Sequence, residues 1–128
     1  MKLLIDSHAI VWCMTDDPRL SPVARKALGS SQHQRFLSLA SLWELSLKVA
    51  AGRLQGTGST IGNLQQASLQ QGIMILPITY EHIVRVESLP LHHADPFDRL
   101  LVAQALEEGL AVLTADRALS RYPAPVVW

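Results

Sequence analysis

The stretch HADPFDRLLVAQALEEGLAVLTAD, residues 93–116, contains a helix signal followed at once by a strand signal. Asp95 and Pro96 are typical of the cap and first turn of a helix, and the apolar run that follows ends at Gly109. The run LAVLT at 110–114 then has the length and composition of a buried strand. A helix joined to a buried strand by a glycine is typical of α/β folds.

The same alternation continues through the rest of the chain. Further apolar runs predict buried strands at 3–5, 36–40, 73–76 and 125–128. Ser21, Ser41 and Thr79 are predicted to open helices at 22–28, 42–51 and 80–89, with another helix near 61–71 after a glycine-rich loop at 52–63. We therefore expect a single domain over residues 1–128, a three-layer α/β/α sandwich around a mainly parallel sheet.

Composition limits the class of protein. The chain is 48% hydrophobic, and its eleven basic residues balance eleven acidic ones, so total charge neither supports nor excludes a nucleic-acid partner. The single cysteine, Cys13, cannot form an internal disulfide and is interpreted as a small core residue of the first helix. Because no signal peptide or membrane-length apolar run is present, we expect a cytoplasmic protein without a membrane partner.

Four acidic residues are predicted to lie at one edge of the sheet. Asp6 and Asp116 each follow a strand, whereas Glu44 and Asp98 lie in the first turn of a helix. In an open parallel sheet, strand carboxyl ends and the following helix starts share one edge. Charges about 5 Å apart would repel by roughly 3 kcal/mol per pair, so a cation is expected there. Oxygen ligands favour Mg²⁺ or Mn²⁺ over Zn²⁺.

Each acid also has a local interpretation, so two alternatives stay open. Asp95 and Asp98 would complement the amino end of their helix, S-x-x-E at 41–44 fits a capping box, and Asp6 or Asp116 would suit a turn. A non-catalytic binding module with helix-capping acids explains these features too. A phosphoacceptor receiver domain also gathers acids around magnesium, but it needs a lysine after a late strand, which LAVLTAD does not provide.

The histidines are not predicted to supply a rival metal site. His92 and His93 are adjacent in a loop and lack the spacing that places two imidazoles on one helix face. His8, His33 and His82 are scattered along the chain, so we interpret all five as structural or solvated.

A carboxylate-bound magnesium ion suits hydrolysis of a phosphodiester. Once the four acids are neutralised by metal, the rest of the chain has a surplus of basic residues that favours a polyanion. Arg99, Arg53 and Lys48 are the candidates for phosphate contacts, although Lys48 is also spaced to pair with Glu44 at i,i+4.

Four motifs in one order carry a family resemblance: LLIDSHAIVW, SLWELSLKVAAGRL, HHADPFDRLLVAQA and LTADRALSRY. Together they resemble a PIN-domain ribonuclease of the VapC type, the toxin of a toxin-antitoxin pair, and the resemblance runs over the whole chain. It implies magnesium-dependent cleavage of RNA, inhibition by a small antitoxin protein, and homodimers.

The resemblance also implies roles for individual residues. Its metal-binding, catalytic carboxylates fall on Asp6, Glu44, Asp98 and Asp116, with Asp95 as a supporting N-cap. Ser7 stands where the family usually has threonine and keeps the hydroxyl, and Thr114 is expected to orient Asp116. Ala94 replaces a basic residue often found before D-P-F-D-R, which puts a substrate contact at that position in doubt. The sequence does not indicate which RNA is cleaved.

Overall fold

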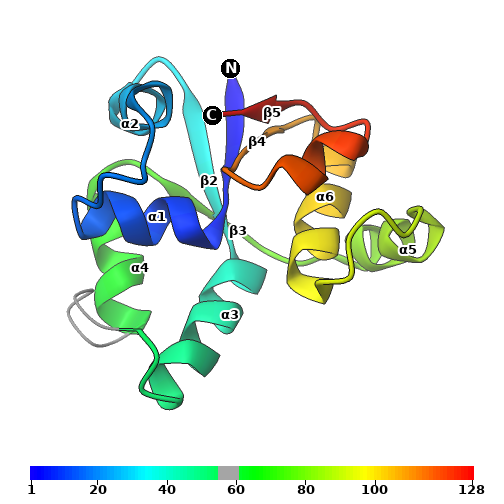
Figure 1. The fold of residues 1–128 in the computed structure, drawn as a ribbon, viewed down its shortest axis with the longest axis horizontal. Helices are drawn as coiled ribbons and strands as arrows, with labels where there is room; N and C mark the ends of the chain where they lie inside the picture. The colour runs from blue at the N-terminus through cyan, green and yellow to red at the C-terminus, as the bar shows by residue number, and fades with distance from the viewer. Residues whose placement is uncertain (55–60) are drawn as a thin grey trace.

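The computed structural model describes residues 1–54 and 61–128, so the predicted loop at 52–63 lies partly outside the described residues. Within them, five parallel strands form one sheet in the order β3-β2-β1-β4-β5 (Figure 1). The strands are β1 Lys2–Ile5, β2 Gln34–Ser38, β3 Met74–Leu76, β4 Ala111–Leu113 and β5 Val126–Val127. All five predicted strands are confirmed, and the sheet is entirely parallel.

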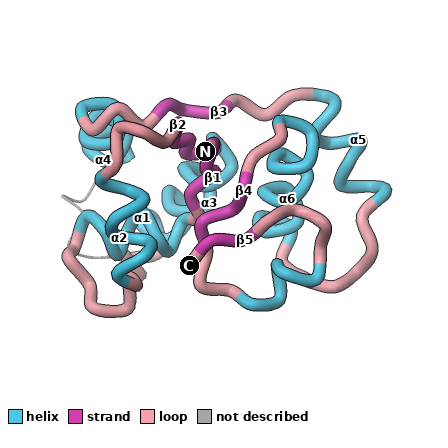
Figure 2. Tube along the Cα trace, turned by 90° about the horizontal axis from the view of Figure 1, so that it is seen from above, coloured by secondary structure: helices cyan, strands magenta, loops and turns pink. Residues whose placement is uncertain are grey.

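Helices cover both faces of this sheet, which confirms the predicted α/β/α sandwich. They are α1 Ser7–Met14, α2 Pro22–Gly29, α3 Leu39–Ala50, α4 Ile61–Gln70, α5 Tyr80–Ser88, α6 Pro96–Glu108 and the short 3₁₀ helix η1 Arg117–Arg121. In Figure 2, α1, α2 and α4 lie on one side of the strands, and α5 and α6 lie on the other.

The central strand β1 divides the core into two halves. Leu3 and Ile5 pack with α1, α2, α3 and α4, whereas Leu4 packs with α6 and the segment after it. All three side chains are fully buried, because successive residues of a strand point to opposite faces and helices cover both. No helix within residues 1–54 or 61–128 is long and apolar enough to cross a membrane.

Three predicted helix starts are confirmed by their capping hydrogen bonds. The side chains of Ser21, Thr79 and Asp95 each accept a backbone N–H from the first turn of α2, α5 and α6. Gly109 ends α6 with φ 67°, a left-handed conformation that favours glycine. These boundaries depend on local chemistry, which the sequence displays directly.

The start of α3 differs from the prediction. The N-cap is Ser38, three residues before the predicted Ser41, and β2 therefore ends at residue 38 and not at 40. The Ser38 hydroxyl accepts the Ala40 N–H at 3.0 Å and donates to Gln104 Oε1 at 2.6 Å, which turns the chain helical early. The capping box expected at 41–44 is wrong, because Glu44 lies in the second turn of α3.

Candidate metal centre

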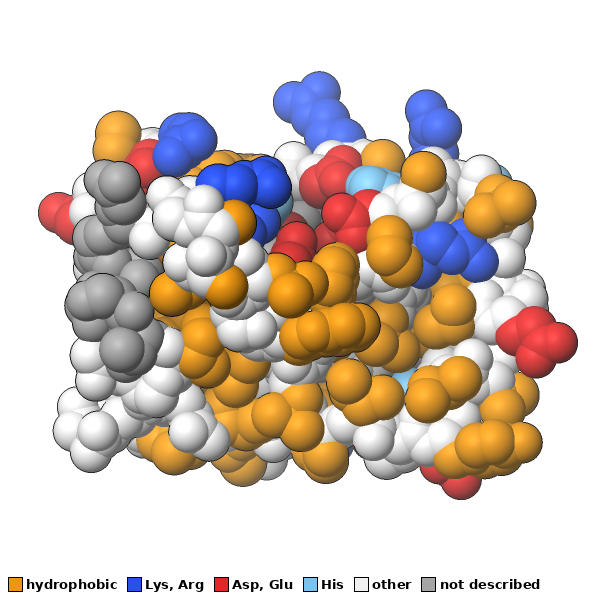
Figure 3. Space-filling model, turned by 90° about the horizontal axis from the view of Figure 1, so that it is seen from below, with side chains coloured by type: hydrophobic (Ala, Val, Ile, Leu, Met, Phe, Trp, Pro, Cys, Tyr) orange, Lys and Arg blue, Asp and Glu red, His pale blue; other side chains and the backbone are white. Residues whose placement is uncertain are grey.

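The carboxyl edge of the sheet holds an acidic pocket. Asp6 directly follows β1, Asp116 lies three residues after the end of β4, and Asp98 lies in the first turn of α6. These three residues line one pocket of about 290 Å³. Figure 3 shows acidic side chains gathered beside a histidine on this face, with basic side chains around them. Residues distant in sequence therefore meet where the sequence predicted an acidic edge.

Asp6 is buried, at 4% exposed, and both of its carboxylate oxygens accept hydrogen bonds. The backbone N–H of His8 donates to Oδ1 at 3.0 Å, and the Thr114 hydroxyl donates to Oδ2 at 2.5 Å. Burial raises the pKa of Asp6, but the hydrogen bonds from His8 and Thr114 outweigh it and leave that pKa below its ordinary value of 3.8. The carboxylate is thus held in its charged form.

Glu44 joins this arrangement through a hydroxyl. Ser7 Oγ lies 2.7 Å from Glu44 Oε1 and 3.2 Å from Asp6 Oδ1, so the hydroxyl bridges the two acids. Glu44 Oε2 lies 3.9 Å from the Lys48 ammonium, which is the i,i+4 pair expected from the sequence. Glu44 therefore reaches Asp6 from α3 although it does not line the pocket itself.

Asp98 has the opposite electrostatic character to Asp6. Burial and, after it, the negative charges of Asp6, Asp95 and Glu44 raise its pKa to about 7, although His93 lowers it in part. A carboxyl that holds its proton near neutral pH indicates negative charge without sufficient compensation. This crowding is the electrostatic mark of a cation site.

Asp116 is fixed at both carboxylate oxygens. Its Oδ1 accepts the Ala118 N–H at 2.9 Å and caps η1, whereas its Oδ2 lies 2.8 Å from His93 Nε2. The Asp116 N–H donates to Thr114 Oγ1 at 3.0 Å. Thr114 therefore connects Asp116 to Asp6 and supports both acids.

Two of the histidines interpreted from the sequence as structural or solvated lie at the acids: His8 lines the acidic pocket, and His93 contacts Asp98 and Asp116. The Nε2 of His93 lies 3.3 Å from Asp98 Oδ2 as well as next to Asp116, and these three residues could share one ion. Spacing rules detect partners on a single helix, whereas His93 reaches Asp116 across 23 positions of the chain. Its place two residues before the Asp95 cap is the one sequence signal that brings it near.

Arg99 does not point into the acidic pocket, which corrects its predicted phosphate contact. Its guanidinium donates to the carbonyl oxygens of Val86, Leu89 and Pro90, at 3.2, 3.3 and 2.9 Å, and to the Tyr122 hydroxyl at 3.2 Å. These carbonyls lie at and beyond the carboxyl end of α5, where a cation is favoured. Arg99 therefore ties α6 to α5.

Asp95 supports the site from the cap of α6. Its Oδ1 accepts the backbone N–H groups of Phe97 at 2.8 Å and Asp98 at 3.4 Å. The residue does not line the acidic pocket. This geometry agrees with its expected capping role.

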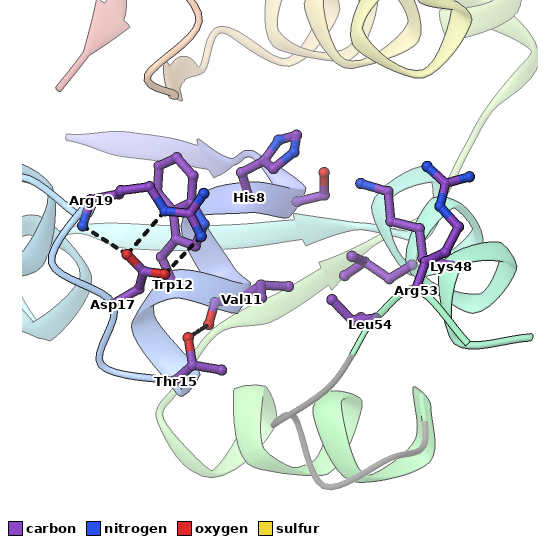
Figure 4. Close-up of a pocket in the computed structure, with 11 residues that line it drawn as sticks. His8, Val11, Trp12, Thr15, Asp17, Arg19, Lys48, Arg53 and Leu54 are labelled. Carbon is purple, nitrogen blue, oxygen red and sulfur yellow. Dashed lines mark hydrogen bonds and ion pairs between the residues drawn. The ribbon is translucent and has the colours of Figure 1, made fainter. Parts of the chain in front are cut away.

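A groove of about 670 Å³ adjoins the acidic pocket and shares His8, Trp12 and Arg19 with it. Figure 4 shows Lys48 and Arg53 on one side of the groove and Arg19 beside Trp12 on the other. The Arg19 guanidinium carbon lies 4.7 Å from the centre of the Trp12 ring. Basic side chains therefore line a path that leads to the carboxylates.

The residues of the pocket fit a divalent cation that prefers oxygen. Asp6, Asp98 and Asp116 offer carboxylate oxygens in one pocket, and Glu44 lies next to Asp6, joined to it through the Ser7 hydroxyl. Magnesium and manganese favour such ligands, and either ion would offset the charge that raises the pKa of Asp98. Both the donor set and the electrostatics support such a centre.

Solved structures share this fold. VapBC2 from Rickettsia felis, bound to a DNA fragment from its promoter, aligns with a TM-score of 0.75 and 14% identity over 98% of this chain and 97% of that one. FitAB bound to the IR36 DNA fragment aligns with a TM-score of 0.65 and 20% identity, over 97% and 92% of the two chains. At these identities the likeness shows the fold alone.

Sequence comparison is more specific. The model of the PIN domain matches residues 3–125. The chain is 33% identical over 132 residues to Ribonuclease VapC22 from Mycobacterium tuberculosis (strain ATCC 25618 / H37Rv), a match that covers 98% of each protein. With the parallel sheet and the acidic edge already described, these matches establish that the chain belongs to the PIN domain family, within its VapC type.

Proposed function

We propose that the protein is a magnesium-dependent endoribonuclease that acts as the toxin of a toxin-antitoxin pair. The single observation that carries the proposal is the pocket that brings Asp6, Asp98 and Asp116 together. The relative named a ribonuclease supports RNA as the substrate class. Membership in the PIN domain family removes support from the receiver-domain alternative.

The four carboxylates would hold the ion, with Mn²⁺ as a substitute for Mg²⁺. A bound divalent ion lowers the pKa of water and offsets charge on a phosphodiester. The chain supplies the orientation: Ser7 and Thr114 fix Asp6, Ser7 also fixes Glu44, and Thr114 receives the Asp116 N–H. Such fixed ligands reduce the reorganisation that the reaction would otherwise need.

The groove beside the pocket supports a path for the RNA backbone. Lys48 and Arg53 line it, and His8 and Trp12 lie between the groove and the acids. Lys and Arg at such positions neutralise phosphates without reading sequence. We assign phosphate contacts to Lys48 and Arg53, which were also the candidates from the sequence, and not to Arg99.

We also propose that the protein acts in the cytoplasm with two protein partners, a cognate antitoxin and a second copy of the same chain. The VapBC2 and FitAB structures are complexes, which supports a small cognate antitoxin for this chain. Leu39, Trp43 and Leu47 expose one apolar face of α3 at four-residue spacing, and each is at least 42% exposed. This face supports a homodimer, because large apolar side chains grouped on a surface favour a protein contact.

Single substitutions at the acids test the function. Asp6→Asn and Asp98→Asn should each reduce magnesium-dependent cleavage of a mixed RNA substrate by at least about 100-fold, because each removes a charged ligand. Glu87→Gln, on the exposed side of α5, is the matched control and should keep wild-type activity. Circular dichroism checks that the variants fold. Full activity in both Asp variants would reject the proposal.

The non-catalytic alternative is supported by a specific observation: Asp6, Asp95 and Asp116 each cap a helix. If capping were their whole role, Mg²⁺ or Mn²⁺ would give no saturable increase in melting temperature. A saturable increase that Asp98→Asn weakens would favour the metal centre, since Asp98 is not a cap.

A further inference from the structure

The ring of His93 is held in one tautomer. The backbone N–H of Asp95 donates to His93 Nδ1 at 3.0 Å, so Nδ1 must accept and has no proton. In the neutral ring the proton is then on Nε2, which lies 2.8 Å from Asp116 Oδ2 and 3.3 Å from Asp98 Oδ2. A nitrogen that carries a proton has no lone pair to offer a metal ion.

The backbone of His93 is fixed as well. The N–H groups of His92 and His93 both donate to the Tyr122 hydroxyl at 3.1 Å. The His93 side chain is 19% exposed. Turning the ring toward another partner would break its bonds to both Asp95 and Asp116, so the donor direction of Nε2 is set by the loop.

Asp116 depends on this donor. Its Oδ1 is committed to the Ala118 N–H, and His93 is the side chain that binds its Oδ2 among the described residues. Without His93, the Asp116 carboxylate would keep one anchor, the Ala118 N–H, and would be free to turn away from the pocket.

We propose that His93 is a positioning residue that holds Asp116 in the pocket by donating its Nε2 proton, beside Asp98, and that it is not itself a metal ligand. The inference rests on the proposed metal-dependent function. It adds a residue whose effect passes through the Asp116 carboxylate.

The tautomer can be measured without any metal. Nitrogen-15 NMR of the imidazole groups in metal-free protein at pH 8 should show His93 with its proton on Nε2 and none on Nδ1. A His93→Gln sample assigns the signals. A His93 ring with its proton on Nδ1 would leave Nε2 free as a ligand and would overturn the inference.

Metal binding gives the second measurement, with Mn²⁺ alone as the probe in titration calorimetry. His93→Ala should bind Mn²⁺ about 10- to 100-fold more weakly with the same number of sites, as losses of groups behind metal ligands do. His93→Gln should recover part of the affinity, because its amide donates a hydrogen bond. His92→Ala is the matched control: His92 packs on Tyr122 at 5.0 Å between ring centres, and its loss should leave the affinity unchanged.

Each contrary result has a distinct meaning. Wild-type affinity in His93→Ala, or no recovery in His93→Gln, would overturn the positioning role while the proposed function stands. Pulsed electron paramagnetic resonance of the Mn²⁺ protein should show no directly coordinated imidazole nitrogen, and a coordinated His93 would overturn the inference. Wild-type protein that binds no Mn²⁺ would reject the proposed function and the inference together.

Discussion

The acidic pocket has two halves, one around Asp6 and one around Asp98, and the pKa values of these two carboxyl groups are shifted in opposite directions. Asp6 is 4% exposed, yet its pKa is lowered, because hydrogen bonds from His8 and Thr114 stabilise the charge. The Asp98 side chain is 19% exposed, yet burial and neighbouring acids raise its pKa to about 7. Burial alone therefore does not decide the charge of either group.

The difference shows that hydrogen bonds to a carboxylate affect its pKa more than its exposed fraction does in this pocket. Asp6 accepts hydrogen bonds from other groups of the protein, so its carboxylate is charged and fixed in place before any ion binds. The nearest polar group to the Asp98 carboxylate among the described residues is His93 Nε2 at 3.3 Å, which already donates to Asp116, so the charge of Asp98 depends on an outside cation. Asp6 is therefore already charged for an ion, whereas relief of the unfavourable charge at Asp98 supplies much of the free energy of ion binding.

The largest expected effect is on stability without metal. Asp98→Asn should raise the free energy of unfolding at pH 8 by up to about 4 kcal/mol, since a pKa near 7 instead of 3.8 reflects a charge that folding disfavours. Urea unfolding in a chelating buffer measures it, with Glu87→Gln as the control. A less stable Asp98→Asn protein would contradict the comparison between the two halves.

The pH dependence fixes the sign of this effect. The folded state binds the Asp98 proton more tightly than the unfolded state, so between about pH 4 and 7 the wild-type free energy of unfolding contains a contribution that falls as pH rises. Below pH 4 the side chain is protonated in both states, and the advantage of Asp98→Asn should disappear. An advantage that stayed constant with pH would point to packing and not to charge.

Metal binding should stabilise the wild-type protein by a somewhat smaller amount. At Mg²⁺ concentrations near 100 times the dissociation constant, linkage gives about 2.7 kcal/mol. Asp98→Asn should gain less than wild type at the same concentration, because it has lost both a ligand and the repulsion that the ion relieves. Thermal melts across a magnesium titration measure both proteins. Equal gains would place Asp98 outside the metal centre.

The smallest expected effect on stability tests the hydrogen bonds around Asp6. Thr114→Val keeps the shape of the side chain but removes the hydroxyl that Asp6 and the Asp116 N–H share, and it should cost about 2 kcal/mol of stability. Thr114→Ser retains the hydroxyl and should stay close to wild type in urea unfolding. If the two variants were equally stable, hydrogen bonding would not explain the lowered pKa of Asp6.

Local chemistry made much of this molecule predictable. The caps at Ser21, Thr79 and Asp95 and the apolar strands are short-range signals, and they gave the parallel sandwich and its acidic edge. The start of α3 was misplaced because Leu39 and Ala40 are apolar and suit a strand equally well. Ser38 caps α3 through the Ala40 N–H, and its hydroxyl also donates to Gln104, 66 positions away, a contact that no local pattern shows.

Long-range contacts account for what the sequence did not predict. His93 meets Asp116 across 23 positions, and Arg99 reaches the Tyr122 hydroxyl across the same separation. Neither contact has a spacing rule, since each crosses from one element to another. Arg99 ends the D-P-F-D-R motif and His93 lies two residues before it, so proximity in sequence indicated the region but not the direction of the side chains.

The hydroxyl of Tyr122 has a practical consequence for protein engineering. One phenol oxygen is the meeting point of the His92 and His93 backbone and the Arg99 side chain, so the irregular segment before α6 takes its shape from a residue near the end of the chain. A designer who transplants the four acids to another scaffold must also carry Tyr122 and Arg99. A graft without them would copy the acidic residues but not the backbone that orients their side chains.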